Sequence, residues 1–279
     1  PREDPEHDSM CGLLIRHMYG TRAAADGWQE EYSTAIVRLG LVQGDASPNV
    51  FCNYEKQITA SVHGGDFTSS SPADALDWFE AALAEQYGLT VAPRMGPGPH
   101  DAKDGRVLNF IIRWLDGRIE YECDPRQVER FIAECGLNGA KAVATPGAKA
   151  TFKELQDDSE ELPGHLTTAS RGAAASGNYL AADRLDSQFA CKGSCRWMSR
   201  PSKHAWKAMK RMCRYLAGAP RLVYVYEQQE ANAIDVYTDT DWAGCPRTRE
   251  STRGGCVMLG KHAIKTWSAT QSSVSLSSG

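Results

Sequence analysis

Apolar residues in the first part of the chain recur at helical and strand spacings in turn, which predicts alternating elements. Helical spacing extends over residues 11–41, where the apolar side chains fall on one face. Two short runs at 50–54 and 57–63 have strand character and are joined by a turn. Residues 72–87 return to helical spacing, and Ser71 is placed to cap that helix.

The middle of the chain predicts a hairpin followed by a helix. Residues 106–114 and 118–123 form the two predicted strands, with a turn at Gly117. Asp124 then precedes a helix whose apolar residues lie on one face, and Gly136 marks its end.

Helices and strands are also expected in the second half of the chain. Small and polar residues dominate 138–178 and predict a linker or loose connection. Two helices should follow, over 178–198 and 202–217, the second with an apolar stripe that begins at Trp206. Strand patterns return near the end, at 222–226, 234–238, 255–259 and 263–267.

The composition is that of an ordinary globular protein. Of the 279 residues, 42% are hydrophobic and 24% are charged, and the formal net charge is -4. That charge gives no overall signal for a nucleic acid or a membrane. No apolar run approaches the roughly 20 residues that span a bilayer, and the charged N-terminus lacks the apolar core of a signal peptide. We therefore expect no membrane partner.

The nine cysteines are scattered and odd in number, which suits reduced thiols better than a disulfide framework. Reduced thiols indicate a cytoplasmic or nuclear protein. Cys191 and Cys195 lie one helical turn apart, but no second pair or nearby histidine completes a zinc site. We favour core-facing thiols over metal ligands at these positions.

A basic segment is the clearest local charge feature. Between Ser187 and Tyr226 there are nine Lys or Arg residues and no Asp or Glu. A basic helix face suits a phosphate backbone, and a solvated surface helix is the alternative. The cations of the helix predicted at 202–217 fall away from its apolar stripe; these are Lys203, Lys207, Lys210, Arg211 and Arg214.

Several sequence segments in one order carry a resemblance to a known family. The first are MYGTRAAADGWQEEY (18–32), LGLVQGDASPNVF (39–51) and ITASVHGGDF (58–67). They are followed by RVLNFIIRW and the residues up to 147, by SRPSKHAWKAMKRMCRYLAGAPRLVYVY (199–226), and by the segment that begins VYTDTDWAG. In order and spacing these segments resemble the reverse transcriptase and RNase H of copia-type long-terminal-repeat retrotransposons.

The resemblance implies a polymerase centre at the turn after the second predicted strand. Residues 63–66 take the place of the family's Tyr-Val-Asp-Asp box, so Asp66 matches its second carboxylate and Gly65 stands where the first is expected. A further Asp belongs to a strand that should precede Leu13. The family's chemistry uses two metal ions roughly 4 Å apart, for which oxygen ligands favour Mg²⁺. From the residues alone, the alternative is a plain hairpin turn.

The resemblance also implies part of an RNase H centre. Asp239 ends an alternating strand and matches the family's first metal ligand, and Asp241 is a secondary candidate on the same face. The next ligand of the pattern is a Glu that comes directly after 275–279. A turn or strand-end aspartate is the alternative at Asp239.

The implied architecture is α+β: a partial palm and connection followed by an incomplete RNase H-like sheet. We expect a palm and post-palm segment over 1–137, a linker and helical connection over 138–220, and the RNase H start over 221–279. The partners would be an RNA or DNA template-primer or an RNA–DNA hybrid, and the oligomeric state stays open.

Three functional interpretations follow from the resemblance and the residues. The first is a Pol polyprotein fragment whose ancestral activity is RNA-directed DNA synthesis with RNase H, and which we expect to be inactive because key carboxylates are missing. The second is a non-catalytic nucleic-acid-binding remnant that uses the basic segment. The third is a decayed reading frame.

Overall fold

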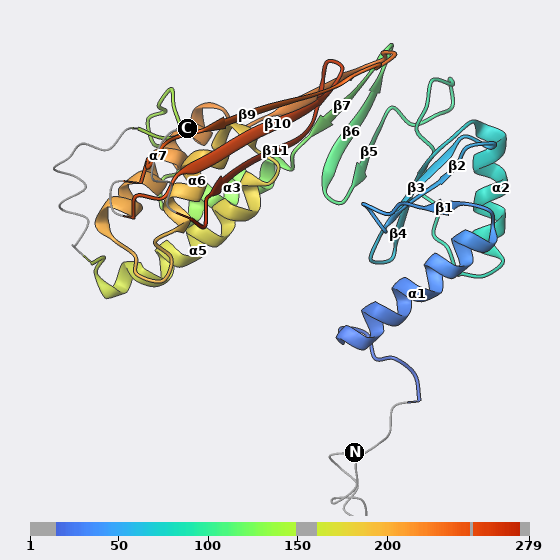
Figure 1. The fold of residues 1–279 in the computed structure, drawn as a ribbon, viewed down its shortest axis with the longest axis horizontal. Helices are drawn as coiled ribbons and strands as arrows, with labels where there is room; N and C mark the ends of the chain where they lie inside the picture. The colour runs from blue at the N-terminus through green and yellow to red at the C-terminus, as the bar shows by residue number, and fades with distance from the viewer. Residues whose placement is uncertain (1–14, 149–160, 246–247, 274–279) are drawn as a thin grey trace, which may run out of the picture. The chain divides into compact units, whose positions relative to one another are not determined.

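The computed structural model describes residues 15–148, 161–245 and 248–273 (Figure 1). The chain divides into two compact units, Pro1–Ala92 and Pro93–Gly279, and each is described by itself. The strands of the described residues form antiparallel sheets, and helices accompany them in both units. The predicted α+β class is therefore confirmed, whereas the predicted boundaries at 137 and 220 stay predictions.

The first unit is built on one sheet with the strand order β1-β2-β3-β4. Along β3 every second residue is buried, namely Ile58, Ala60 and Val62, so only one face of the sheet is covered. The predicted strands at 50–54 and 57–63 are confirmed. The four strands are β1 (Val42–Gln43), β2 (Val50–Asn53), β3 (Ile58–His63) and β4 (Asp66–Ser70).

Two helices, α1 (Arg22–Arg38) and α2 (Ala73–Ala84), supply the apolar side chains that pack with this sheet. The helix predicted over 11–41 begins only at Arg22, because the hydroxyl of Thr21 accepts a hydrogen bond from the backbone N–H of Ala24 and starts the helix there. Residues 11–14 of that prediction lie outside the described residues.

Ser71 does not cap α2, so that expectation was wrong. Its hydroxyl instead donates to the carbonyl oxygen of Lys56, which ties the start of α2 to the turn between β2 and β3.

The second unit contains a sheet of the order β5-β6-β7-β8. The single strand predicted at 106–114 is in fact two strands, because Leu108 and Asn109 have φ of 51° and 72° and reverse the chain between them. Asn tolerates this left-handed conformation, whereas Leu rarely adopts it. The strands are β5 (Asp104–Val107), β6 (Phe110–Leu115), β7 (Arg118–Glu122) and β8 (Val223–Glu227).

A buried carboxylate links β8 to this sheet. Glu122 on β7 is 1% exposed and accepts hydrogen bonds from Arg221, at 2.5 and 2.8 Å, just before β8. Arg113 on β6 makes a second ion pair with Glu122, at 2.5 Å. The hydrogen bonds from Arg221 and then Arg113 hold the pKa of Glu122 below its usual value although burial acts in the opposite direction.

The helices of this unit are α3 (Pro125–Glu134), α5 (Gly164–Ala181), α6 (Gln188–Cys195) and α7 (Lys203–Gly218). The predictions for α3 and α7 are confirmed, including the Asp124 cap and the left-handed Gly136. The linker predicted at 138–178 is wrong for 164–178, which belong to α5.

The helix predicted at 178–198 is interrupted after Ala181. The buried guanidinium of Arg184 lies at this break and donates to the carbonyl oxygens of Ala219 and Pro220, at 2.7 and 3.1 Å. It also pairs with Asp186 at 2.7 Å, so its charge is balanced. These bonds anchor the break against the end of α7.

Small residues allow α5 to lie inside the helical layer. Gly177 is buried, and a Cβ added there would lie 3.1 Å from side-chain carbons of both Phe131 on α3 and Met212 on α7. The composition that suggested a loose linker therefore serves close helix packing.

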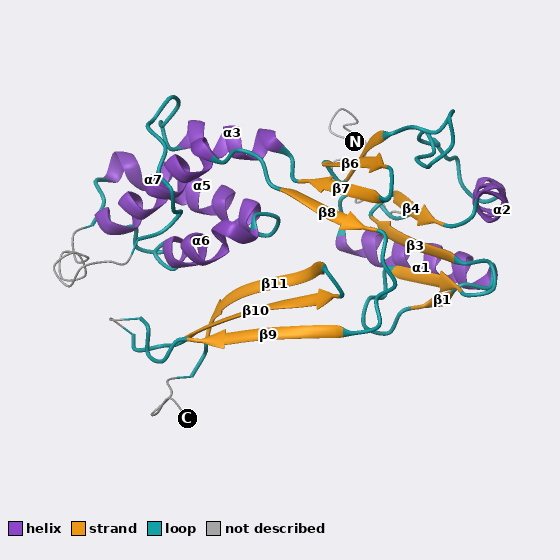
Figure 2. Cartoon of the chain, turned by 90° about the horizontal axis from the view of Figure 1, so that it is seen from above, coloured by secondary structure: helices purple, strands orange, loops and turns teal. Residues whose placement is uncertain are grey.

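A third sheet has the order β11-β10-β9 and lies beside α6 (Figures 1 and 2). No residue of its strands is fully buried, in contrast to the first unit. Ile234 and Val236, which share one face of the alternating strand, are 65% and 59% exposed. The strands are β9 (Ile234–Thr240), β10 (Thr252–Leu259) and β11 (His262–Thr270).

We expect Gly177→Val to destabilise the second unit by about 1–3 kcal/mol, because the added carbons must displace Phe131 and Met212. The matched control is Gly172→Ala on the exposed side of the same helix, where no atom lies within 4 Å. That change should stabilise the helix by up to about 1 kcal/mol. Urea unfolding followed by circular dichroism measures both, and equal effects of the two substitutions would contradict the packing described for α5.

Candidate functional site

Asp66, the polymerase-like candidate, lies at the start of β4 and pairs across the hairpin with His63. Gly64 and Gly65 form the turn between them, and Gly64 has φ of 59°, which a side chain would disfavour. Asp66 is exposed. The hairpin geometry expected from the sequence is thus present, with Gly65 beside Asp66.

An indole holds this turn in place. Nε1 of Trp28 on α1 donates to the carbonyl oxygen of Gly64 at 2.6 Å. The Trp28 ring packs edge-on against Phe67 and Tyr87, with ring centroids 6.3 and 5.3 Å apart. Burial, together with the charge of Glu31, raises the pKa of the Tyr87 hydroxyl. Trp28 lies within the helix predicted over residues 11–41, but the spacing of apolar residues gives no sign that it positions the Asp66 hairpin.

Asp239, the RNase H-like candidate, lies near the end of β9, directly opposite Gly254 on β10. It is exposed, and within the described part of the chain its carboxylate has no hydrogen-bond or ion-pair partner. The strand that carries it is confirmed as extended, which agrees with the expected position.

Asp241 lies just beyond β9 and serves the backbone. Its carboxylate accepts a short hydrogen bond from the N–H of Thr252, while its own N–H donates to the carbonyl oxygen of Thr252 at 3.0 Å. The carboxylate also lies so close to Gly244 that any side chain there would collide with it. Asp241 therefore fixes the connection between β9 and β10.

Lys192 on α6 reaches the same place. Its Nζ donates to the hydroxyl of Thr252 at 2.7 Å, so Thr252 contacts both the ammonium and the Asp241 carboxylate. Burial lowers the pKa of Lys192, and the negative charge of Asp241 opposes that shift.

Lys192 is one of three polar residues spaced a helical turn apart that join α6 to the sheet. Gln188 donates to the hydroxyl of Thr266 at 3.1 Å, and Arg196 pairs with Glu250 at 2.6 Å. Asp239 pairs with Gly254 on β10, which pairs with Ser268 on β11, and paired residues share a face of the sheet. Thr252 and Thr266 are each two residues from one of these partners, so they lie on the same face as Asp239.

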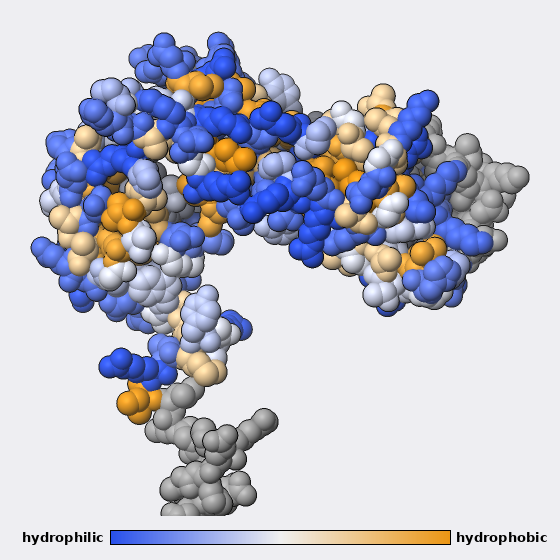
Figure 3. All heavy atoms as spheres, turned by 180° about the vertical axis from the view of Figure 1, so that it is seen from behind, coloured by the Kyte–Doolittle hydropathy of each residue, from blue (hydrophilic) through white to orange (hydrophobic). Residues whose placement is uncertain are grey.

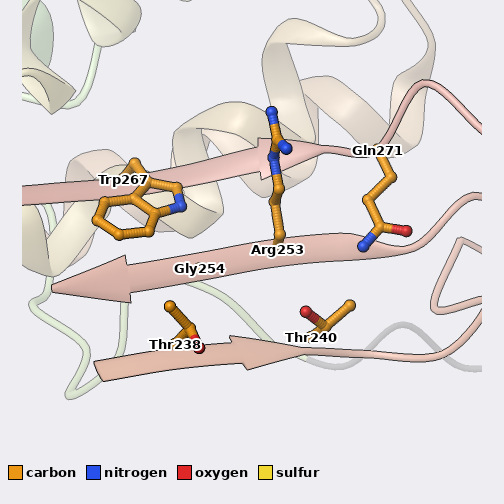
Figure 4. A pocket seen from close by; sticks show the side chains of 6 residues that line it. All are labelled: Thr238, Thr240, Arg253, Gly254, Trp267 and Gln271. Carbon is orange, nitrogen blue, oxygen red and sulfur yellow. The ribbon is translucent and has the colours of Figure 1, made fainter. Parts of the chain in front are cut away.

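A groove of about 410 Å³ lies on the other face of this sheet. Asp239 does not line it, since the pleat directs Asp239 away from the face that carries its neighbours Thr238 and Thr240. Figure 4 shows these threonines beside the Arg253, Trp267 and Gln271 side chains. The groove and the candidate metal ligand are thus separate features.

The structure does not gather carboxylates around either candidate. Within the described residues, no group of three or more His, Cys, Asp or Glu side chains could hold a metal ion. Two adjacent Mg²⁺ ions need several carboxylates between them. The donors at Asp66, and at Asp239 with the hydrogen-bonded Asp241, do not fit that requirement.

The basic residues predicted as a nucleic-acid contact all lie on α7, on the side away from its buried stripe. Lys203 and Lys207 are exposed, whereas Lys210 lies 5.3 Å from the centre of the Trp206 ring. Arg211 donates to the Thr145 hydroxyl at 2.8 Å, and Arg214 donates to the Lys141 carbonyl oxygen at 2.7 Å. The two arginines therefore hold the segment after α3 as well as carrying charge.

Acids from distant parts of the chain neutralise some of the basic segment. Glu161 pairs with Arg200 at 2.8 Å, and Glu122 and Glu250 pair with Arg221 and Arg196. The absence of acids between Ser187 and Tyr226 therefore overstated the charge of this surface.

The two neighbouring thiols of α6 face the helical layer, as expected. Cys191 is fully buried, its sulfur lies 3.6 Å from that of Cys195, and Cys195 donates to the carbonyl oxygen of Ala174. The hydrogen bond with Cys195 and burial raise the pKa of Cys191.

Among the described residues, no helix has the length and apolar character that crossing a membrane requires. On the face drawn in Figure 3, apolar side chains occur as scattered patches among polar ones.

Comparison with known proteins gives retrotransposon relatives. The Retrovirus-related Pol polyprotein from transposon RE2 of Arabidopsis thaliana is 35% identical over 268 residues, and that from transposon RE1 is 33% identical over 278. These matches cover 94% and 95% of this chain, but only 17% of either polyprotein. The Uncharacterized mitochondrial protein AtMg00810 of the same plant is 36% identical over 155 residues, 55% of this chain and 62% of that protein. No protein-family model and no solved structure matches.

We expect Trp28→Phe to loosen the Asp66 hairpin, because the ring remains while the hydrogen bond to Gly64 is lost, a change of about 1 kcal/mol. Amide hydrogen exchange across β3 and β4 should accelerate. Trp78→Phe is the control, since it removes the same indole group from α2 without touching this turn. Equal acceleration by both substitutions would show that Trp28 does not hold the turn.

Proposed function

The chain belongs to the copia-type retrotransposon Pol polyproteins, and on that premise we propose that it corresponds to the later part of a reverse transcriptase followed by the start of an RNase H. The order of the segments at 18–67, 106–147, 199–226 and 236–279 supports this assignment. The Asp66 hairpin and the extended strand with Asp239 are compatible with the two positions. The ancestral activity would be RNA-directed DNA synthesis with hydrolysis of the RNA strand of a hybrid.

We further propose that this chain does not catalyse either reaction by itself. In such reactions, Mg²⁺ ions held by carboxylates stabilise the attacking and leaving oxygens. The carrying observation is that, within the described residues, no group of three or more potential metal ligands forms at either centre, and that Asp241 Oδ1 already accepts from the Thr252 N–H. The one or two carboxylates that the described residues bring to each centre cannot hold two divalent ions against their hydration and mutual repulsion.

A second candidate function is binding of nucleic acid by the outer side of α7. Lys203, Lys207 and Lys210 follow one side of this helix, where a phosphate backbone could lie along them. Such binding depends on summed charge and not on a metal, so it can persist without catalysis. The proposed partner is the RNA or DNA template-primer, or the RNA–DNA hybrid, that the family resemblance implies. The proposed location is the cytoplasm or the nucleus.

Activity assays test the first proposal. The purified chain should extend a primed template, or cut an RNA–DNA hybrid, in Mg²⁺ no faster than its Asp66→Asn and Asp239→Asn variants do. Primer extension that is lost in Asp66→Asn, or hybrid cleavage that is lost in Asp239→Asn, would show that catalysis survives and would overturn the proposal.

The salt dependence of binding tests the second proposal. We expect Lys203→Gln/Lys207→Gln/Lys210→Gln to reduce the slope of log affinity against log salt by about 2 for a single strand, because three phosphate contacts are lost. Arg38→Gln/Arg253→Gln/Lys265→Gln removes the same charge elsewhere and should change the slope far less. Fluorescence anisotropy with a labelled oligonucleotide measures both. Equal slopes for the two variants would exclude α7 as the contact.

A further inference from the structure

Lys192 occupies an unusual position for a lysine of the basic segment. Unlike Lys203 and Lys207, it is partly buried, between α6 and the third sheet. Its ammonium lies on the face of the sheet that carries Asp239, and its hydrogen bond ends on Thr252, the residue that also donates to Asp241. A fixed positive charge is therefore part of the carboxylate site.

We propose that Lys192 is the resident counter-cation of Asp241, and that it takes the place of a divalent metal ion at this site. This inference rests on the proposed assignment of Asp239 and Asp241 to the RNase H metal position. It goes beyond that assignment because it names the group that balances the carboxylate charge in this chain.

The chemistry of an ammonium explains why it would exclude a metal. Lys192 and Asp241 meet through Thr252, whose hydroxyl accepts from the ammonium and whose N–H donates to the carboxylate. Opposite charges attract more strongly in such a partly buried site than in water. A divalent ion must lose bound water to reach Asp241, and it must also tolerate the positive charge of Lys192. Arg196, one turn further along the chain, is balanced by Glu250 and adds no net charge there.

The position of α6 keeps this cation in place. Gln188 bonds to Thr266 on β11 and Arg196 to Glu250 just before β10, so the backbone on either side of Lys192 is held beside the sheet and its ammonium is within reach of Thr252.

Titration of the full-length chain with Mn²⁺, followed by paramagnetic broadening of amide signals, tests the inference. Lys192→Met should bind Mn²⁺ at the Asp239 and Asp241 strand end at least about fivefold more tightly than the unchanged chain. Lys265→Met removes the same charge from the opposite face of the same sheet and should stay within about twofold. Lys192→Arg, which keeps the cation, should bind as weakly as the unchanged chain.

A second readout needs no metal. If Lys192 supports the bonds around Thr252, Lys192→Met should accelerate exchange of the Thr252 amide severalfold, and Lys265→Met should not. An unchanged Thr252 amide, or equal Mn²⁺ affinity in the two methionine variants, would overturn the inference. Tight Mn²⁺ binding by the unchanged chain that requires Asp239 would instead overturn the proposed lack of a metal site, which separates the two failures.

Discussion

The polar side chains of α6 connect the helical layer of the second unit to its three-stranded sheet, and the candidate site on that sheet depends on them. No strand residue of β9, β10 or β11 is fully buried, so apolar packing contributes little to holding this sheet. Gln188 and Lys192 instead reach its strands through hydrogen bonds, and Arg196 forms an ion pair with Glu250 in the connection between β9 and β10. Because Lys192 is charged, the docking of α6 also places a positive charge beside Thr252, the residue that donates to Asp241.

Local patterns were sufficient where an element has a clear apolar face and recognisable ends. The α3 helix has its Asp124 cap, its buried Val128 and Phe131, and its left-handed Gly136, and all of these were predicted. The α5 helix was missed because its small residues give little apolar contrast, and their role becomes visible only once Phe131 and Met212 lie against Gly177. Propensity describes a segment alone, whereas burial depends on its neighbours.

The strand positions of the candidate residues could be predicted from the sequence, but their hydrogen-bond partners could not. Asp66 at a hairpin and Asp239 on a strand lie where the sequence placed them, since both positions follow from local strand patterns. The partners of Asp241 could not be predicted, because Thr252 and Lys192 are distant in sequence and meet it only through the sheet register and the docking of α6. The basic segment was overestimated for the same reason, since Glu122, Glu161 and Glu250 come from other parts of the chain.

Membership of the family does not by itself imply catalysis, because two-metal catalysis and phosphate binding respond differently to the loss of residues. Two-metal catalysis needs every ligand at once, so under the proposed assignment a glycine at 65 would remove most of it. Phosphate binding is a sum over many weak contacts, and it declines gradually as cations are lost or neutralised. Under the proposed function, the basic side of α7 can therefore still bind phosphates, while the described residues gather no metal-binding group at Asp66 or Asp239. Lys192 fits this pattern, since a lysine ammonium can balance a carboxylate once no divalent ion has to be bound there.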